Sequence, residues 1–173
     1  LMKYFKEYLC VGGLPDVVNV FNLTHDLTQV REIQKSILES YKDDFGKHLN
    51  KDEVQEINQT ELTKIMQVYK SIPNQLAKEN KKFQYKLVAS NAKARSHSNA
   101  ITWLEEFGLI CKCHNLNNLE LPLDGNKDED TFKIYVTDTG LFIAMLEEGT
   151  TDNIINGDLK IYKGAIFENI IAD

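Results

Sequence analysis

The strongest restriction on the fold comes from an amphipathic helical run that leads directly into an alternating segment with turn residues. The apolar positions of the run recur at helical spacing: Ala100, Ile101, Leu104 and Phe107. Gly108 then stands where a helix ends in the left-handed conformation. From Leu109 onward, apolar and polar residues alternate, which predicts a β-hairpin. A helix followed by a hairpin is the outline of a winged-helix module.

The alternation predicts several short strands in this part of the chain. We expect strands over residues 109–115, 119–121 and 132–136, with a turn at Asn117-Asn118, and a further short strand at residues 83–87. A helix beginning near Ser96 or Ser98 would lead into them. Elsewhere the apolar spacing is helical, so the predicted fold class is mainly α with a small β-hairpin or sheet.

The N-terminal part is predicted to be helical. Residues 1–10 form one amphipathic run, Gly12-Gly13 interrupts it, and Pro15 can begin the next helix. Asp26 is a suitable N-cap for a helix that continues to Tyr41, and Asp138 for a helix that follows the hairpin.

Positive charge is concentrated beside the predicted hairpin. Residues 81–104 contain five basic residues and no acidic one, in a chain whose net charge is −6. The five are Lys81, Lys82, Lys86, Lys93 and Arg95. A local positive block in an acidic chain is a candidate surface for the phosphates of duplex DNA. The alternative is that these side chains are simply solvated.

Other patterns give little indication of catalysis or of a metal. No GxxxxGK[ST] phosphate loop, no strand ending in paired acids and no Ser-His-Asp order is found. Asp124, Asn126, Asp128 and Asp130 alternate as calcium ligands do, but Glu129 occupies the position that requires glycine. Cys111, Cys113 and His114 lack the second ligand pair of a zinc site. We therefore predict no metal site and no enzymatic activity in this segment.

Location can also be predicted. Three cysteines, an odd number, favour reduced thiols, and neither a long apolar run nor a signal peptide is visible, so we expect a cytoplasmic protein with no membrane contact.

Several phrases together resemble a known family. They are GGLPDVV, SIPNQLAKENKKFQY, the run from NAKAR to WLEEFGLI, LPLDGNKDEDTFKIYVTDTGLFIAML, and YKGAIFENIIAD. In this order, and over nearly the whole chain, they resemble the C-terminal half of prokaryotic AAA+ type P-loop ATPases, which join an ATPase core to a C-terminal domain of unknown function.

The resemblance implies a division of the chain and a set of site residues. Residues 1–57 would belong to the helical lid, 58–148 to a winged-helix-like domain and 149–173 to the start of a truncated nuclease-like domain. Gly12, Gly13 and Pro15 would approach the nucleotide, because only glycine lets a backbone come so close to a ligand. Glu168 matches the glutamate on the first helix of a fold that resembles PD-(D/E)xK nucleases.

The resemblance also places the chemistry outside the chain. The ATP- and Mg-binding sequences would precede Leu1, so ATP and Mg are expected only in the full-length parent, and no cofactor is expected here. Both ends fall within predicted helices, and we expect the chain to be a piece of a longer polypeptide.

Two functional hypotheses follow. In the first, a lid and a winged helix couple nucleotide state to DNA contact. In the second, the winged helix is a protein-interaction or assembly module, whose apolar helix faces at residues 1–9 and 166–171 pack on the missing domains or on another copy in a homo-oligomer.

Overall fold

The computed structural model describes residues 1–49, 55–78, 82–158 and 162–172 of the 173-residue chain. In chain order its elements are α1 (Met2–Val11), α2 (Pro15–Thr24), α3 (Leu27–Leu49), α4 (Gln55–Ala77), α5 (Tyr85–Val88), α6 (Ala94–Glu106), β1 (Ile110–Leu116), the 3-10 turn η1 (Leu123–Asn126), β2 (Lys127–Val136), α7 (Thr139–Ala144), α8 (Thr150–Asn156) and α9 (Lys163–Ala172). The predicted fold class, mainly α with a small β-hairpin, is confirmed.

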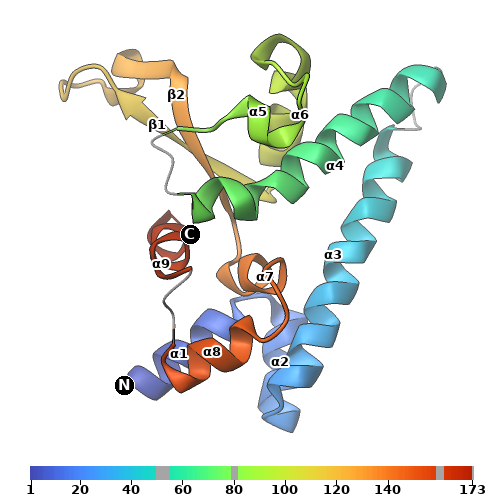
Figure 1. The fold of residues 1–173 in the computed structure, drawn as a ribbon, viewed down its shortest axis with the longest axis vertical. Helices are drawn as coiled ribbons and strands as arrows, with labels where there is room; N and C mark the ends of the chain where they lie inside the picture. Colours follow the sequence, from blue (N-terminus) through green and yellow to red (C-terminus); the bar gives the residue numbers. More distant parts are fainter. Residues whose placement is uncertain (50–54, 79–81, 159–161, 173) are drawn as a thin grey trace.

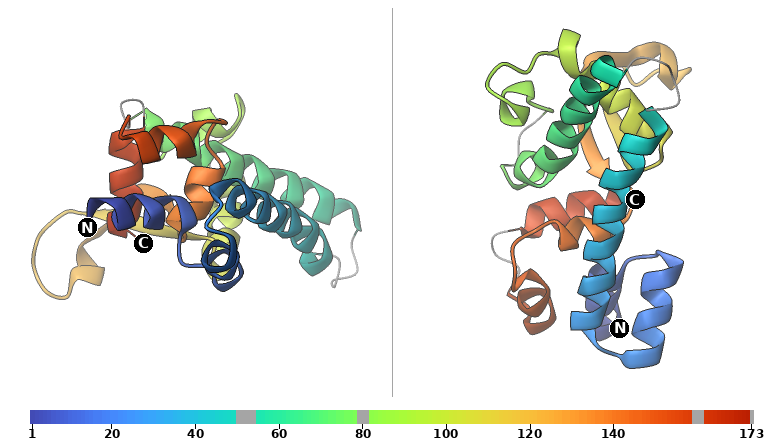
Figure 2. Two further views of the ribbon diagram at one scale, coloured as in Figure 1. Left: turned by 90° about the horizontal axis from the view of Figure 1, so that it is seen from below. Right: turned by 90° about the vertical axis from the view of Figure 1, so that its right-hand side faces the viewer.

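The long helix α3 connects the two ends of the structure. In Figure 1, α1, α2 and α8 lie at one end, and α5, α6 and the β1–β2 hairpin lie at the other. Figure 2 shows from two further sides that α3 runs along the helices of the first end and reaches towards α4. Phe45 of α3 is buried there, and its ring makes edge contacts with Tyr69, Trp103 and Phe107.

Helices α4, α5 and α6 and the hairpin follow one another in the order of a winged helix. Ala100, Ile101 and Leu104 of α6 are buried and belong to one hydrophobic cluster with the buried face of α4. Gly108 ends the helix region with φ +75°, as predicted. The predicted start at Ser96 or Ser98 is wrong, because the N-cap is Lys93 and Ser96 lies inside the first turn.

The sheet has two strands, whereas four strands were predicted in this part of the chain. β1 pairs antiparallel with β2 from Ile110 opposite Val136 to His114 opposite Phe132, and the register shifts after His114. The strand predicted at residues 119–121 is wrong. The N–H of Asn117 donates to Asn126 O at 2.8 Å, and this bond closes a loop in which the leucines of the 119–121 segment have no strand beside them.

The strand predicted at residues 83–87 is also wrong, because residues 85–88 form the short helix α5. Phe83 N donates to Phe132 O at 2.7 Å, beside β2. Gln75 of α4 then holds the next residue with both ends of its amide: Nε2 donates to Gln84 O, and Oε1 accepts from Gln84 N, both at 2.9 Å. This side chain takes the backbone groups that a longer strand would have offered to a neighbour.

One hydrophobic cluster passes through all three predicted segments. It includes Leu9 of α1, Phe45 of α3, Leu104 of α6, Phe142 of α7 and Ile166 of α9. The boundaries near residues 57 and 148 stay a prediction.

Candidate functional site

The structure describes four of the five basic residues that were predicted to contact DNA, and all four are exposed. Lys82 precedes α5, Lys86 lies on α5, Lys93 is the N-cap of α6, and Arg95 lies in its first turn. Lys81 lies outside the described residues. Within the described part of the chain, none of these four forms an ion pair.

Other lysines near the hairpin are neutralised by partners. Lys112 Nζ lies 2.8 Å from Glu105 Oε2, and Lys127 Nζ lies 2.6 Å from Asp124 Oδ1. The segment 82–95 therefore differs from its surroundings in carrying exposed cations that form no ion pair within the described residues. Exposed charge of this kind attracts polyanions through long-range electrostatics.

The outward face of α6 continues this surface. Arg95, Asn99 and Thr102 are exposed, and no acidic residue precedes Glu105 on the helix. Arginine and asparagine are the side chains that most often read base edges in the major groove. The opposite face of α6 packs on the core, and its His97 bonds Ser96 Oγ at 2.8 Å through Nδ1.

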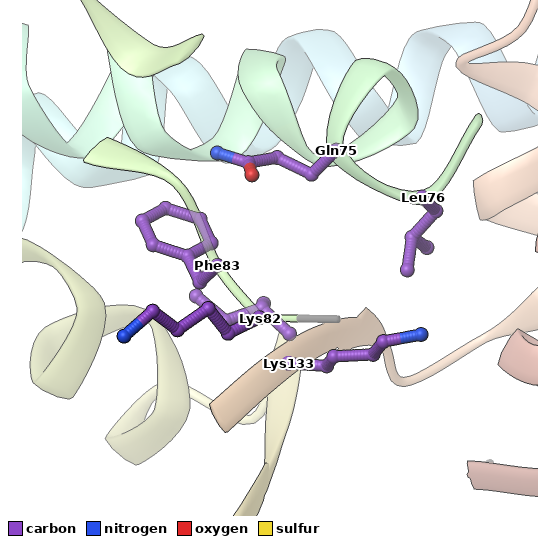
Figure 3. Close-up of a pocket in the computed structure, with 6 residues that line it drawn as sticks. Gln75, Leu76, Lys82, Phe83 and Lys133 are labelled. Carbon is purple, nitrogen blue, oxygen red and sulfur yellow. The ribbon is translucent and has the colours of Figure 1, made fainter. Parts of the chain in front are cut away.

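Lys82 lies beside a hollow that is too small for a ligand. Its volume is about 10 Å³, enough for one water at most, and it lies between Gln75, Phe83 and Lys133. Figure 3 shows the Lys82 and Lys133 chains extending in opposite directions, so the two ammonium groups do not converge on one site.

The segment 117–131, which would be the wing of the predicted winged-helix-like domain, differs from α6 in charge. Residues 117–131 contain five acidic residues and one lysine. The loop also exposes apolar side chains, with Leu119 at 89% and Leu121 at 86% of their full accessibility. Its one lysine, Lys127, is paired with Asp124, so this segment offers no unpaired cation to a phosphate backbone.

The Gly12-Gly13 turn contacts the start of α7. Asp138 is the predicted N-cap of that helix, and its Oδ1 accepts from Leu141 N at 2.7 Å. Its Oδ2 accepts from Gly13 N at 2.7 Å. Gly12 has φ +74°, and a Cβ atom there would overlap the Asp138 carboxylate.

The contact is close on both sides. A Cβ atom added at Gly140 would lie 2.5 Å from Val11 O, so backbone packs directly against backbone. Pro15 begins α2 and is exposed. These contacts give Gly12 and Gly13 a role within the chain, and the nucleotide contact of Gly12, Gly13 and Pro15 stays a prediction.

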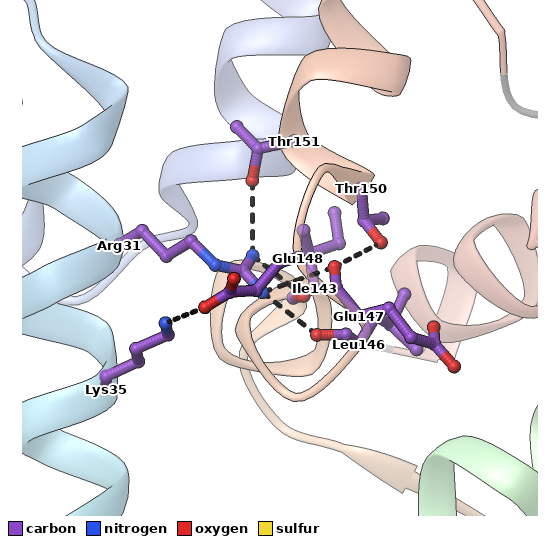
Figure 4. A network of polar contacts seen from close by, with 8 residues as sticks. All are labelled: Arg31, Lys35, Ile143, Leu146, Glu147, Glu148, Thr150 and Thr151. Carbon is purple, nitrogen blue, oxygen red and sulfur yellow. Dashed lines mark hydrogen bonds and ion pairs between the residues drawn. The ribbon is translucent and has the colours of Figure 1, made fainter.

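Arg31 of α3 binds the connection between α7 and α8. Its guanidinium donates to Leu146 O at 2.9 Å, to Glu147 O at 3.4 Å, to Ile143 O at 3.5 Å and to Thr151 Oγ1 at 3.3 Å. Lys35 Nζ lies 3.1 Å from Glu148 Oε1 one turn further along (Figure 4). Sequence reasoning missed Arg31, because a lone arginine on a helix gives no local signal of its partners.

Glu168 and its neighbour Asn169 attach α9 to the hairpin. Glu168 Oε2 accepts from Lys133 Nζ at 2.7 Å and from Tyr135 OH at 3.3 Å. Burial and the nearby Glu168 carboxylate raise the pKa of Tyr135. Asn169 is fully buried, donates to Val136 O at 3.0 Å and accepts from Val136 N at 2.9 Å.

These bonds hold Glu168 in an ion pair within the chain. Its nuclease-like role stays a prediction. Among the described residues, no group of three His, Cys, Asp or Glu side chains is placed to hold a metal ion. None of the described helices is both long enough and apolar enough to span a membrane.

The fold defines a mainly helical protein in which three helices lead into an antiparallel hairpin. The chain belongs to a family described as a domain of unknown function (DUF8612), whose model matches residues 2–152. Helix α9, with Glu168 and Asn169, lies beyond the matched residues. No curated protein and no solved structure matches the chain.

Proposed function

We propose that this chain is the lid and winged-helix-like part of an AAA+ type ATP-binding protein, and that its α5–α6 face contacts duplex DNA. One observation carries the DNA contact: Lys82, Lys86, Lys93 and Arg95 are exposed and form no ion pair within the described residues. The family resemblance supports the ATPase part, in which ATP and Mg would bind the preceding core of the full-length parent.

The position of two of these cations supports a binding role. Lys93 and Arg95 lie at the N-terminus of α6, where the partial positive charge of the helix dipole makes a cation unfavourable. Fold stability therefore gives no reason for their presence. A phosphate would be favoured at the same place by both the side chains and the helix end.

One contact supports a coupling between the Gly12-Gly13 turn and the hairpin. β2 ends at Val136, two residues before Asp138, whose carboxylate binds Gly13 N. A displacement of the Gly12-Gly13 turn would therefore pull on the end of β2. If the turn lies beside the nucleotide in the parent, as the resemblance implies, this contact would couple nucleotide state to the winged-helix-like part.

The wing favours a second candidate function, protein interaction or assembly. Its exposed Leu119 and Leu121 and its negative charge suit a protein partner or another copy better than a phosphate backbone. The exposed Leu1, Met2 and Tyr4 of the N-terminal helix and Ile171 of α9 are further apolar positions for such contacts.

Fluorescence anisotropy with a labelled duplex tests the DNA contact. For four phosphate contacts, affinity should fall about 100-fold between 50 and 200 mM salt. Lys93→Glu with Arg95→Glu should weaken binding by at least about tenfold. The control, Lys3→Glu with Lys163→Glu, makes the same charge change at exposed positions on α1 and α9 and should have a much smaller effect.

Two results would decide between the candidates. Absence of binding at about 50 µM protein and low salt would overturn the DNA contact. A stable dimer in light scattering that Leu119→Ser with Leu121→Ser dissociates would support assembly through the wing. We also propose a cytoplasmic location, which the odd number of cysteines, three, supports.

A further inference from the structure

A groove of about 230 Å³ lies between α6 and the hairpin. On the helical side it is lined by the small residues Ala94 and Ser98. On the hairpin side it is lined by Phe132, Glu129 and Asp130. The groove borders the surface of the four cations, because Ala94 lies between Lys93 and Arg95, but none of the four cations lines it.

Aromatic rings fix the shape of the groove. Tyr85 and Phe132 both line it, and both pack on Phe83, the first edge-on at 5.2 Å between ring centroids and the second stacked at 5.8 Å. The His114 ring contacts Phe132 at 5.5 Å between ring centroids, inclined at 47°. Because these rings hold one another in place, the aromatic lining of the groove is formed before any ligand binds.

The charge in the groove is negative. Lys112, the one lysine that lines it among the described residues, is paired with Glu105. The Asp128 carboxylate accepts a hydrogen bond from Asp130 N at 3.0 Å. The pKa of Asp128 is lowered, mainly by a hydrogen bond from the Thr131 side chain and to a smaller extent by the Asp130 N–H and the charge of Lys82. Its carboxylate is therefore engaged within the strand.

Glu129 and Asp130 are the acidic residues that line the groove. In the part of the chain that the structure describes, neither carboxylate is paired with a lysine or arginine. His114 Nδ1 lies 3.9 Å from Glu129 Oε2 and 3.2 Å from Asp128 O. The Glu129 side chain is 79% exposed, so it stands at the rim and can reach a ligand.

We infer that this groove binds an arginine side chain from a segment of a partner protein. A guanidinium is planar, stacks on aromatic faces and bonds carboxylates through two parallel N–H groups. Tyr85 and Phe132 supply the faces, and Glu129 and Asp130 supply the carboxylates. A DNA phosphate is repelled from the same place, so any DNA would follow α5 and α6 without entering the groove.

Nuclear magnetic resonance titration tests the inference with the peptide acetyl-Ala-Arg-Ala-Arg-Ala-amide. The backbone amides of Ser98, Thr102 and Asp130 should shift on its addition. The control peptide replaces both arginines by citrulline, which has the same shape and no charge, and it should shift these amides at least about tenfold less strongly. Equal shifts with both peptides would overturn the inference.

A pair of variants separates the groove from general charge. Glu129→Gln with Asp130→Asn should weaken the arginine peptide by about tenfold or more. Glu106→Gln with Glu120→Gln removes the same charge from exposed residues that do not line the groove, and its affinity should stay within about twofold of the original.

Equal weakening by the two pairs, or the absence of shifts at about 1 mM peptide, would also overturn the inference. Unchanged resonances in α1 and α8 would verify that the variants keep the fold. Because no DNA is present in this experiment, its failure leaves the proposed DNA contact standing, and the reverse holds for the anisotropy measurement.

Discussion

The contact between the Gly12-Gly13 turn and α7 differs from the α5–α6 face in where its polar groups are bonded. At the turn, Asp138 binds Gly13 N and Leu141 N, and Gln34 donates to Cys10 O and Val11 O at 2.9 and 3.1 Å. On the α5–α6 face, the charged groups of Lys82, Lys86, Lys93 and Arg95 have no ion-pair partner among the described residues. Contacts within the fold account for the residue pattern of the turn, whereas no ion pair within the described residues accounts for the charge of the α5–α6 face.

The first region should therefore respond to mutation through stability and the second through binding. Substitutions test that division, beginning with Asn169, whose amide also donates to Thr139 at the start of α7 and whose loss should cost the most.

Asn169→Ala should lower the free energy of unfolding by about 3 kcal/mol, because it leaves both the N–H and the C=O of Val136 buried without a partner. Urea denaturation measures the change. Glu168→Ala removes a half-exposed ion pair with Lys133 and should cost less than about 1 kcal/mol. Equal costs would show that α9 is not held by the Asn169 amide.

Gly140→Ala should cost about 2 kcal/mol, because its new Cβ atom would lie 2.5 Å from Val11 O and force two backbone segments apart. Gly125→Ala is the control, since the nearest atom there is Pro122 Cγ at 3.9 Å, and it should change stability by less than about 0.5 kcal/mol. Thermal unfolding of both variants measures the difference. A tolerated Gly140→Ala would mean that α7 can move away from the turn.

Asp138→Ala should cost about 1.5 kcal/mol, since it removes the N-cap of α7 and the bond to Gly13. Asp138→Asn keeps one oxygen acceptor and should cost less. Amide hydrogen exchange in α7 and at Gly13 should increase together in the alanine variant. Faster exchange in α7 alone would show that the cap matters and the turn contact does not.

Local sequence patterns were enough for part of this structure. Asp26, Asp138 and Gly108 were predicted as helix ends because a cap depends on residues within one turn. The bond between Gly13 and Asp138 joins residues 125 positions apart, and no periodicity in the sequence indicates it. No local pattern indicates the role of Arg31 either, since its partners are mainly backbone carbonyls of a distant segment.

The predicted strands failed where alternation had no partner. Leu119 and Leu121 alternate with polar residues, yet they lie in a loop, because β1 pairs with β2 and the loop closes on Asn126.

The basic segment could be predicted because charge density is a property of neighbouring residues. The groove could not, because it requires Glu129 and Asp130 to lie across from Ala94 and Ser98.

The smallest effect is expected for Lys93→Ala with Arg95→Ala. The cap of α6 is made by the backbone of Lys93, whose N–H and C=O both bond Ser96 Oγ, at 3.3 and 3.0 Å, so alanine preserves it. Loss of two cations from a helix N-terminus removes an unfavourable interaction with the dipole. Stability should therefore stay within about 0.5 kcal/mol of the original or rise slightly.

The same pair of substitutions gives the sharpest separation of the two regions when stability and DNA affinity are measured on one sample. Retained stability with at least about tenfold weaker DNA binding would mean that these side chains serve DNA binding and not the stability of the fold. A loss of more than about 1 kcal/mol would mean that the cations help to hold the entrance of α6. In that case, the α5–α6 face would resemble the Gly12-Gly13 contact, and its exposed charge would no longer point to DNA.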